Sequence, residues 1–321
     1  MSNTRDLLSE RYALVDDEFT PAVLHGLSRP QKSLPCRFFY DARGSELFEE
    51  ITRLPEYYQT RTEAAILAAH AGEMAENVPQ GGVLVEFGSG SSRKTETLLQ
   101  HLQQLRAYIM IDVSRSALED ARDRLAKRFP ALDVRPIVAD FSDPVALPAD
   151  LADSHRTGFF PGSTIGNLTH AEARGFLKAS RSLLGANGAF VVGVDLKKDT
   201  RILLPAYNDR LGVTAAFNLN LLERINRELH GTFDLGGFAH EAIYNAECGR
   251  IEMHIRSLAR ARVGVLGEAF DFAEGETIHT ENSHKYTVAE FQALARSAGW
   301  TAREVWTGEA GLFSLHFLAP E

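Results

Sequence analysis

Short apolar runs alternate with longer amphipathic segments between residues 83 and 194. The apolar runs predict five strands, over 83–85, 108–111, 134–138, 157–160 and 189–194. The segments between them carry apolar residues at helical spacing and predict helices, over 94–105, 116–128 and 171–184. Strands that alternate with helices indicate a parallel sheet with both faces covered.

The pattern changes over residues 198–287. Apolar residues at helical spacing predict two helices there, over 203–211 and 217–225. Further along, apolar and polar residues alternate over 251–255, which predicts a half-buried antiparallel strand. We therefore expect this part of the chain to form an inserted α+β subdomain.

The α/β pattern resumes after the insertion, with a helix over 288–298 and strands over 301–306 and 312–318. Before the first strand, residues 60–63 fit a helix capping box ahead of an Ala-rich stretch. The predicted parts of the chain are therefore an N-terminal segment (1–60), a main domain (61–197 plus 288–321) and the insertion (198–287).

The composition is that of a globular protein of 321 residues, of which 44% are hydrophobic. Lys and Arg number 34 and Asp and Glu number 43, so the formal net charge is −9. This acidic balance argues against nucleic acid and against an anionic membrane surface as partners. We expect a monomer that binds a small molecule.

The cysteines and the N-terminal residues indicate a cellular location. Cys36 and Cys248 lie far apart and outside any CxxC motif, which favours a reducing, cytoplasmic compartment. The first twenty residues contain five acidic residues and no apolar run, so no signal peptide is expected. The apolar runs elsewhere are of strand length, too short for a membrane span.

A glycine turn, Gly88-Ser89-Gly90, follows the first predicted strand and precedes a helix. Glycines at this point let the backbone turn sharply and approach a ligand closely. A nicotinamide dinucleotide site requires a third glycine, and this chain has Arg93 in its place. Glu86, two residues before the turn, instead suits the cationic groups of S-adenosylmethionine.

Acidic residues end the next two strands. Asp112 ends the second strand, where a carboxylate can hold both hydroxyls of a ribose. Asp140 and Phe141 follow the third strand and can pair with the adenine amino group and cover its ring. Each acid alone is an ordinary strand-end residue, but three in register beside a glycine turn favour S-adenosylmethionine over a nicotinamide cofactor.

No metal or hydrolase motif accompanies this predicted site. The eleven histidines form neither HxxxH nor HExxH, and the chain contains no GxSxG. The sequence therefore predicts no metal.

Four strings of residues are typical of one family. They are KSLP with FYD over 32–41, GS with LF over 44–48, LPEYY with TRTE over 54–63, and PGSTIGNLT over 161–169. From about residue 30 onward the chain closely resembles the histidine-specific Nα-methyltransferases, the EgtD family of ergothioneine biosynthesis. The resemblance implies a class I, Rossmann-like, S-adenosylmethionine-dependent methyltransferase that trimethylates the α-amino group of free L-histidine to hercynine.

The resemblance also implies residue roles. The predicted catalytic residues are Tyr40, Tyr57 and Asn167. The predicted histidine-binding residues are Phe48, Tyr57, Gly162, Thr164, Asn167, Tyr207, Met253, Glu281 and Ser283. Within that set, Glu281 and Ser283 bind the imidazole. The predicted cofactor-binding residues are Tyr40, Glu86, Gly88, Ser89, Gly90, Lys94, Asp112, Asp140 and Phe141.

Singly, most of these residues have a structural explanation. Tyr207 and Phe48 lie on apolar helix faces, Met253 alternates with apolar strand residues, and Asn167 can cap the following helix. Three alternatives stay open: Nα-methylation of another aromatic amino acid such as tryptophan, a nicotinamide oxidoreductase, and a non-catalytic S-adenosylmethionine-binding module.

Overall fold

The computed structural model describes residues 18–90, 92–102, 104–141 and 143–321. The N-terminal residues on which the signal-peptide expectation rests lie, up to residue 17, outside the described residues. Contacts divide the chain into two units. Unit 1 comprises the described residues of Met1–Phe48, Asn208–Ile243 and Glu252–Glu281. Unit 2 comprises those of Glu49–Tyr207, Tyr244–Ile251 and Asn282–Glu321.

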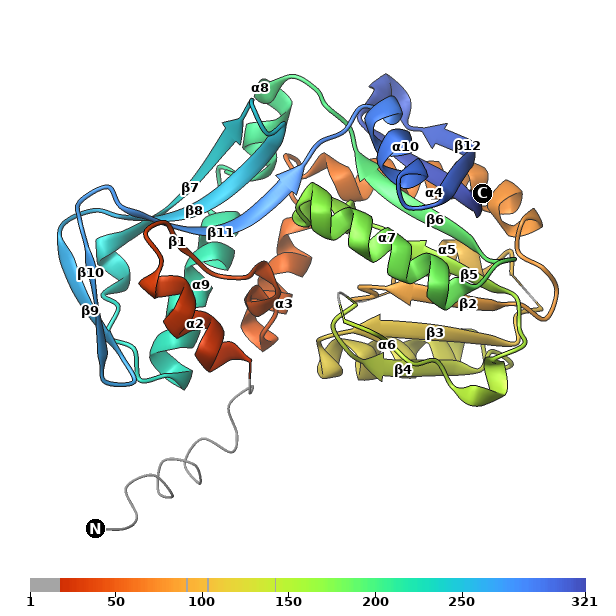
Figure 1. Cartoon of the computed structure of the whole chain (residues 1–321), viewed down its shortest axis with the longest axis horizontal. Helices are drawn as coiled ribbons and strands as arrows, with labels where there is room; N and C mark the ends of the chain where they lie inside the picture. Colours follow the sequence, from red (N-terminus) through yellow and green to blue (C-terminus); the bar gives the residue numbers. More distant parts are fainter. Residues whose placement is uncertain (1–17, 91, 103, 142) are drawn as a thin grey trace, which may run out of the picture. The chain divides into compact units, whose positions relative to one another are not determined.

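Unit 2 is built on a seven-stranded sheet (Figure 1). Across the sheet the strands are β12 (Trp300–Thr307), β13 (Phe313–Pro320), β6 (Ala189–Asp195), β5 (Arg156–Phe160), β2 (Val83–Phe87), β3 (Ala107–Asp112) and β4 (Val134–Val138). The five strands from β6 to β4 are parallel, and β13 is antiparallel to both of its neighbours. This order confirms the predicted class I methyltransferase fold, with five parallel strands and a closing hairpin.

Helices cover both faces of this sheet, as the alternating pattern predicted (Figure 1). One face packs against α4 (Tyr58–Glu76), α5 (Thr95–Leu99) and α6 (Arg115–Arg128). The other packs against α7 (His170–Leu184) and α10 (Val288–Arg296). The central strands β2, β3 and β6 are largely apolar on both faces because both of their faces are buried.

Two helices of unit 2 differ from their predicted bounds. The capping box predicted over 60–63 is wrong, because α4 already begins at Tyr58. The Glu63 side chain does not turn back to cap the helix but is fully buried and ion-paired with Lys94. The helix predicted over 94–105 ends at Leu99, where the chain leaves α5.

Short helical turns connect the elements of unit 2. These are η2 (Ala149–Leu151), η3 (Thr164–Asn167), α8 (Thr200–Leu203), η4 (Leu204–Ala206) and η6 (Glu309–Gly311). The helix predicted over 203–211 is thus only α8 with η4, and Pro205 stands at the start of η4. Proline lacks the N–H that a continuing helix would need.

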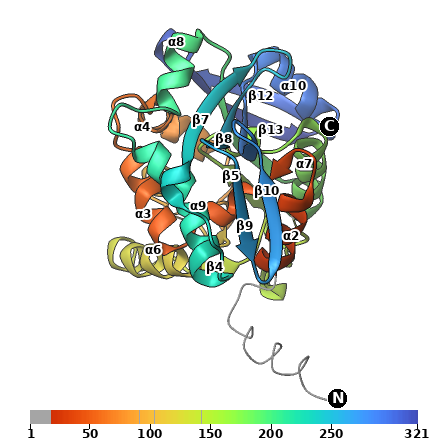
Figure 2. The same cartoon turned by 90° about the vertical axis from the view of Figure 1, so that its left-hand side faces the viewer.

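Unit 1 holds the predicted α+β elements (Figure 2). Its helices are α2 (Phe19–Ser28), η1 (Cys36–Phe39), α3 (Ala42–Ile51), α9 (Val213–Glu228) and η5 (Leu235–Gly237). Its strands are β1 (Lys32–Ser33), β11 (Thr277–His284), β8 (Arg250–Ser257) and β7 (Phe238–Asn245), in sheet order, and the hairpin of β9 (Ala261–Val265) with β10 (Glu268–Phe272). By their contacts, the last residues of α3 and the ends of β7, β8 and β11 belong to unit 2.

None of the described helices combines the length and the apolar character needed to cross a bilayer. This agrees with the strand-sized apolar runs in the sequence.

Candidate active site

The glycine turn after β2 has the backbone conformation that its composition predicts. Gly88 has φ of +65° and Gly90 has φ of +48°, in the left-handed region that glycine adopts without steric cost. The N–H groups of Gly88 and Ser89 donate to the carbonyl oxygen of Ile111, at 2.9 and 3.1 Å. These bonds tie the turn to the end of the neighbouring strand β3.

Asp112, at the end of β3, organises the same turn. Its Oδ2 accepts the Gly90 N–H at 2.7 Å, and its Oδ1 accepts the Ser114 N–H at 2.9 Å. Burial raises the pKa of Asp112, although both N–H groups act in the opposite direction. Each carboxylate oxygen keeps a further lone pair, so both can still accept a hydroxyl of a ligand.

Three features of the turn fit a ligand such as S-adenosylmethionine. The Ser89 hydroxyl is buried and has no hydrogen-bond partner among the described residues. A Cβ built on Gly90 would meet no atom within 4 Å, so open space faces the turn. A Cβ on Gly88 would lie 3.5 Å from Cε1 of Phe141. The structure therefore brings Gly88, Asp112 and Phe141 together, while Asp140 is half-buried at the adjacent strand end.

Glu86, the acid before the turn, is only 1% exposed, and side chains already surround its carboxyl group. Thr95 donates to Oε1 at 2.6 Å, and Tyr108 and Ser92 donate to Oε2. Burial raises the pKa of Glu86 to about 8, against the lowering effect of the Thr95 and Tyr108 hydroxyls. Glu86 thus links the sheet to the start of α5, and its predicted contact with the cofactor stays a prediction.

A second buried acid, Glu63 of α4, was not identified as a site residue from the sequence. Its Oε2 lies 2.6 Å from Lys94 Nζ, and its carboxylate accepts the Gly162 N–H at 2.8 and 3.0 Å. A Cβ on Gly193 would approach Glu63 Oε1 to 2.4 Å, so β6 needs glycine at this point. Glu63 thereby joins Lys94, predicted for the cofactor, to Gly162, predicted for the substrate.

The turn after β5 presents the predicted substrate residues Gly162, Thr164 and Asn167. Gly162 and Ser163 both have positive φ, +80° and +60°. The Ser163 hydroxyl accepts the Asp195 N–H at 2.9 Å, which holds the turn against β6. Thr169, and not Asn167, caps the following helix α7, with Glu172 completing a capping box. The half-buried Asn167 side chain has no hydrogen bond within the described part of the chain.

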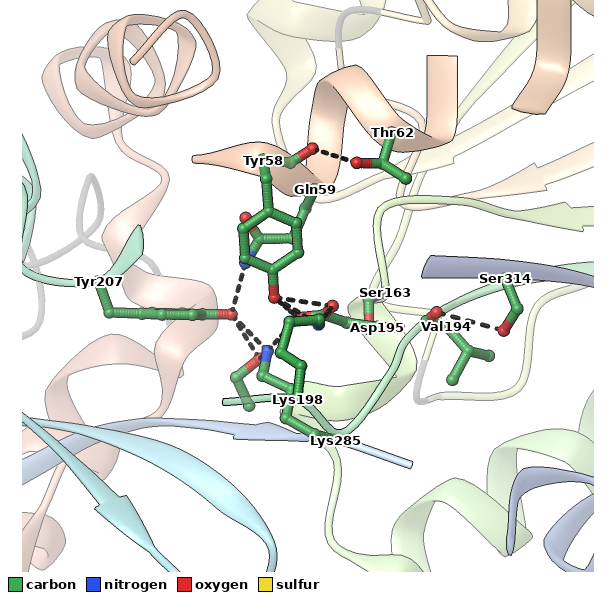
Figure 3. Close-up of polar contacts among 11 residues, drawn as sticks. Tyr58, Gln59, Thr62, Ser163, Val194, Asp195, Lys198, Tyr207, Lys285 and Ser314 are labelled. Atoms are coloured by element: carbon green, nitrogen blue, oxygen red, sulfur yellow. Dashed lines mark hydrogen bonds and ion pairs between the residues drawn. The ribbon is translucent and has the colours of Figure 1, made fainter. Parts of the chain in front are cut away.

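Beyond the end of β6, buried polar side chains from distant parts of unit 2 gather around Asp195 (Figure 3). We call this group the Asp195 cluster; its members are Tyr58, Gln59, Asp195, Lys198, Tyr207, Ser283 and Lys285. The Tyr58 hydroxyl donates to Asp195, with distances of 2.9 and 2.8 Å to its two oxygens. Lys198 ion-pairs with Oδ1 and Lys285 with Oδ2, the latter at 2.7 Å.

The pKa values of the two lysines of the Asp195 cluster shift in opposite directions. Burial lowers the pKa of Lys198 to about 8, and the attraction of Asp195 offsets this only in part. Burial also disfavours the charge on Lys285, but the attraction of Asp195 outweighs it and raises the pKa above its usual range. Burial, with the nearby Asp195 charge, raises the pKa of Tyr58 far above its usual range, so Tyr58 is neutral. With both lysines protonated, the cluster carries a net positive charge.

Two predicted substrate residues, Tyr207 and Ser283, meet inside the Asp195 cluster. Their hydroxyl oxygens are 2.7 Å apart, and Lys285 Nζ donates to both at 2.8 Å. Gln59 Nε2 also donates to the Tyr207 oxygen, at 3.3 Å. Since an ammonium only donates, the hydroxyl oxygens are acceptors here. One hydroxyl hydrogen can bridge the pair.

Of the remaining predicted substrate residues, Tyr57 lies in unit 2, directly before α4, and Phe48, Met253 and Glu281 lie in unit 1, as does Tyr40. The Tyr40 and Phe48 rings pack edge to face with centroids 5.6 Å apart, and Phe217 of α9 lies 5.8 and 6.0 Å from them. Phe217 was seen in the sequence only as an apolar helix position. Met253 is buried on β8, and Glu281 is half-buried on β11.

The structure thus brings the predicted residues together within each unit. In unit 2, the glycine turn meets Asp112 and Phe141, and Tyr207 meets Ser283. In unit 1, Tyr40 meets Phe48. The members that sequence reasoning missed include Glu63, Asp195, Lys198 and Lys285. A weak signal existed for two of them, because Asp195 directly follows a predicted strand and Lys285 lies two residues after Ser283.

The chain is similar to known methyltransferases along most of its length. A family model described as "Histidine-specific methyltransferase, SAM-dependent" matches residues 19–320. The histidine N-alpha-methyltransferase of Mycolicibacterium smegmatis is 41% identical over 298 residues, which cover 91% of this chain and 92% of that protein. The Mycobacterium tuberculosis enzyme of the same name is 41% identical over 303 residues, covering 92% and 93%. Ergothioneine biosynthesis protein 1 of Neurospora crassa is 33% identical over 297 residues, covering 90% of this chain and 33% of that protein.

Proposed function

Because the chain belongs to the family of histidine-specific, S-adenosylmethionine-dependent methyltransferases, we propose that it trimethylates the α-amino group of free L-histidine to hercynine. The observation that carries this proposal is the similarity to two histidine N-alpha-methyltransferases, which includes both units of the chain. The name of the Neurospora crassa relative supports a place in ergothioneine biosynthesis, of which hercynine formation is the proposed first step.

S-adenosylmethionine, when bound, supplies the methyl group, and the chain's own residues hold the two reactants. The glycine turn and Asp112 offer an open surface with acceptor oxygens, and the orphaned Ser89 hydroxyl offers a further polar contact. Alignment of amine and methyl is the main contribution in a direct displacement, worth up to ~7–11 kcal/mol in favourable cases. Lys94, fixed by Glu63, and Phe141 complete the proposed cofactor side.

The amine must be neutral to attack, and the reference pKa of an α-amino group is ~8. Tyr57 and the unengaged amide of Asn167 are proposed to orient the lone pair of the amine. Three successive methyl transfers, with a proton lost before each, convert the amine into a trimethylammonium cation without N–H donors. Aromatic faces suit such a cation, at ~0.5–2 kcal/mol each, and the Tyr40 and Phe48 pair provides two of them.

The Asp195 cluster supports a role in binding the amino acid. Lys285 donates to Tyr207 and Ser283 and thereby fixes the positions of both hydroxyl groups. The net positive charge of the cluster favours a carboxylate as the substrate group beside it. Glu281 and Ser283 are proposed to bind the imidazole, as the family resemblance implies. A site built on those hydrogen bonds rejects analogues that lack the imidazole N–H.

The decisive experiment incubates the purified protein with S-adenosylmethionine and each of the twenty amino acids in turn, and detects methylated products by mass spectrometry. We expect mono-, di- and trimethylated products from histidine. If tryptophan or another amino acid is methylated while histidine is not, the proposal is wrong. Omitting S-adenosylmethionine is the blank.

A variant separates substrate binding from fold support. Glu281→Ala is expected to weaken histidine binding much more than S-adenosylmethionine binding, both measured by isothermal titration calorimetry. Glu274→Ala is the matched control, because this acid is exposed in the turn just before β11. Equal loss of both ligands in Glu281→Ala would mean that the residue supports the fold and not the imidazole.

We also propose that the enzyme is a cytoplasmic monomer that needs no metal for methyl transfer. Cys36 and Cys248 are both free thiols, as a reducing compartment allows. Light scattering of the eluted protein tests the monomer, and activity after exhaustive chelation tests the independence from metal.

A further inference from the structure

Two histidines and a glutamate converge on the sheet of unit 1. Glu252 and His254 belong to β8, and His279 belongs to β11. Their potential ligand atoms all lie within 4.8 Å of one another. Residues two apart on a strand project from the same face, so Glu252 and His254 present their side chains side by side. The neighbouring strand supplies the third group.

The contacts among these three residues are those of a nearly assembled ligand set. His254 Nε2 lies 3.1 Å from Glu252 Oε2. The His254 and His279 rings stack with centroids 4.7 Å apart and an interplanar angle of 19°. At metal–ligand distances of ~2.0–2.2 Å, ligand atoms in a tetrahedral site are about 3.3 Å apart. The carboxylate–imidazole pair already has about this spacing, and the His279 nitrogen, within 4.8 Å of both, must move closer.

A second hydrogen bond orients His279. Its Nε2 lies 3.0 Å from the carbonyl oxygen of Glu281, which can only accept. The proton of His279 is therefore on Nε2, and Nδ1 carries the lone pair. Hydrogen bonds of this kind, from the far ring nitrogen to a carbonyl, fix the tautomer of metal-ligating histidines.

His254 carries an unsatisfied polar atom at this place. The residue is 8% exposed, and its Nδ1 is buried with no hydrogen-bond partner among the described residues. A buried polar atom without a partner is costly. An ion bound at Nε2, the nitrogen that faces Glu252, would fix the proton on Nδ1, and a water molecule would still have to satisfy that nitrogen.

We propose that Glu252, His254 and His279 bind a divalent transition-metal ion, Zn²⁺ being the best match. Two imidazole nitrogens and one carboxylate oxygen suit Zn²⁺ and its first-row neighbours, while Mg²⁺ and Ca²⁺ prefer all-oxygen sites. His279 is half-buried, which gives the ion a route from solvent and leaves room for water as a further ligand. Bound metal would join β8 to β11, so it stabilises unit 1 and takes no part in methyl transfer.

The test uses the full-length protein after removal of any affinity tag and dialysis against a chelator. Zn²⁺ is titrated in competition with a fluorescent chelator, and Co²⁺ is titrated with its visible absorption as a report of coordination geometry. We expect one tight Zn²⁺ per chain, a Co²⁺ spectrum of low coordination number, and an upward shift of Tm with Zn²⁺. No tight Zn²⁺, or a Co²⁺ spectrum of the hexa-aqua type, would overturn the proposal.

Variants locate the ion. His279→Ala, His254→Ala and Glu252→Gln should each weaken Zn²⁺ binding by at least ~10-fold, since loss of even an outer partner of a ligand has that effect. His25→Ala, an exposed histidine of α2, and the double variant Cys36→Ser with Cys248→Ser should bind as before. Zn²⁺ binding that survives in His279→Ala, the least buried of the three, would place the ion elsewhere and refute the assignment. This readout does not depend on the methyltransferase activity.

Discussion

Glu86 and Asp195 are two buried carboxyl groups of the same sheet, and their surroundings are opposite. Glu86 lies on β2 and is 1% exposed, and Asp195 ends β6 and is 0% exposed. Three hydroxyl groups surround Glu86. Two lysines and the Tyr58 hydroxyl surround Asp195.

The difference shows that burial alone does not decide the charge of an acid. Hydroxyl groups compensate part of the desolvation of Glu86, and its pKa still rises to about 8. At neutral pH the protonated form of Glu86 therefore predominates. Asp195 faces two cations inside the protein, and the ionic form is the one that both lysines require. Glu86 is a neutral carboxyl group that links β2 to α5. Asp195 belongs to a charged network that positions Tyr207 and Ser283 through Lys285.

The largest expected effect is that of Asp195→Asn, which would leave Lys198 and Lys285 without their counter-charge. Breaking a buried ion pair from one side costs about 3–5 kcal/mol. We expect a loss of that size in the free energy of unfolding, measured by urea denaturation. A loss below about 1 kcal/mol would mean that the cluster is energetically like a surface pair, and the contrast with Glu86 would fail.

The next effect distinguishes the two lysines. Lys285→Met removes a fully buried cation that serves Asp195, Tyr207 and Ser283, and we expect a cost of about 2–3 kcal/mol. Lys198→Met should cost about half as much, because the pKa of Lys198 is already lowered to about 8 and its charge is less firmly held. Urea denaturation of both variants at pH 7 measures this order, and the reverse order would contradict the proposed roles.

A smaller effect is expected at Glu86 from the loss of one hydroxyl group. Thr95→Val removes the hydrogen bond to Oε1 and should cost about 1 kcal/mol, a typical net value for a buried hydrogen bond. The variant should also raise the pKa of Glu86 further, since the Thr95 hydroxyl lowers it. Thermal unfolding of the variant against wild type at several pH values gives both quantities, and an unchanged pH profile would argue against this link.

For Glu86→Gln we expect a change in stability that is small at low pH and grows as the pH rises. The pKa of Glu86 is about 8 in the folded protein and has a reference value of 4.5, so the folded state holds more protons between these values. The wild type should therefore lose stability as pH rises from about 4.5 to about 8. Glutamine does not titrate, so the stability of the variant relative to wild type should increase over that window. A constant difference across it would show that Glu86 is ionised in the folded protein.

Sequence reasoning was most successful where a signal is local. The five parallel strands and the sharp turn at Gly88 and Gly90 were predicted because each depends on residues within one short segment. It failed at Glu63, where Thr60-Arg61-Thr62-Glu63 has the composition of a capping box. Lys94 and the backbone N–H of Gly162 bind that carboxylate instead, and both lie on other segments that fold against α4.

By itself, then, the sequence determined the α/β order, the glycine turn with its strand-end acids and, through strings typical of a family, the chemistry. Only the tertiary structure decided which charges meet. Tyr58 and Asp195 are 137 positions apart, and Tyr207 and Lys285 are 78 apart. No local pattern encodes such pairs, since a buried charge is tolerated only where the fold brings its partner within hydrogen-bond distance. The same reason explains why Glu252, His254 and His279 match no linear metal motif.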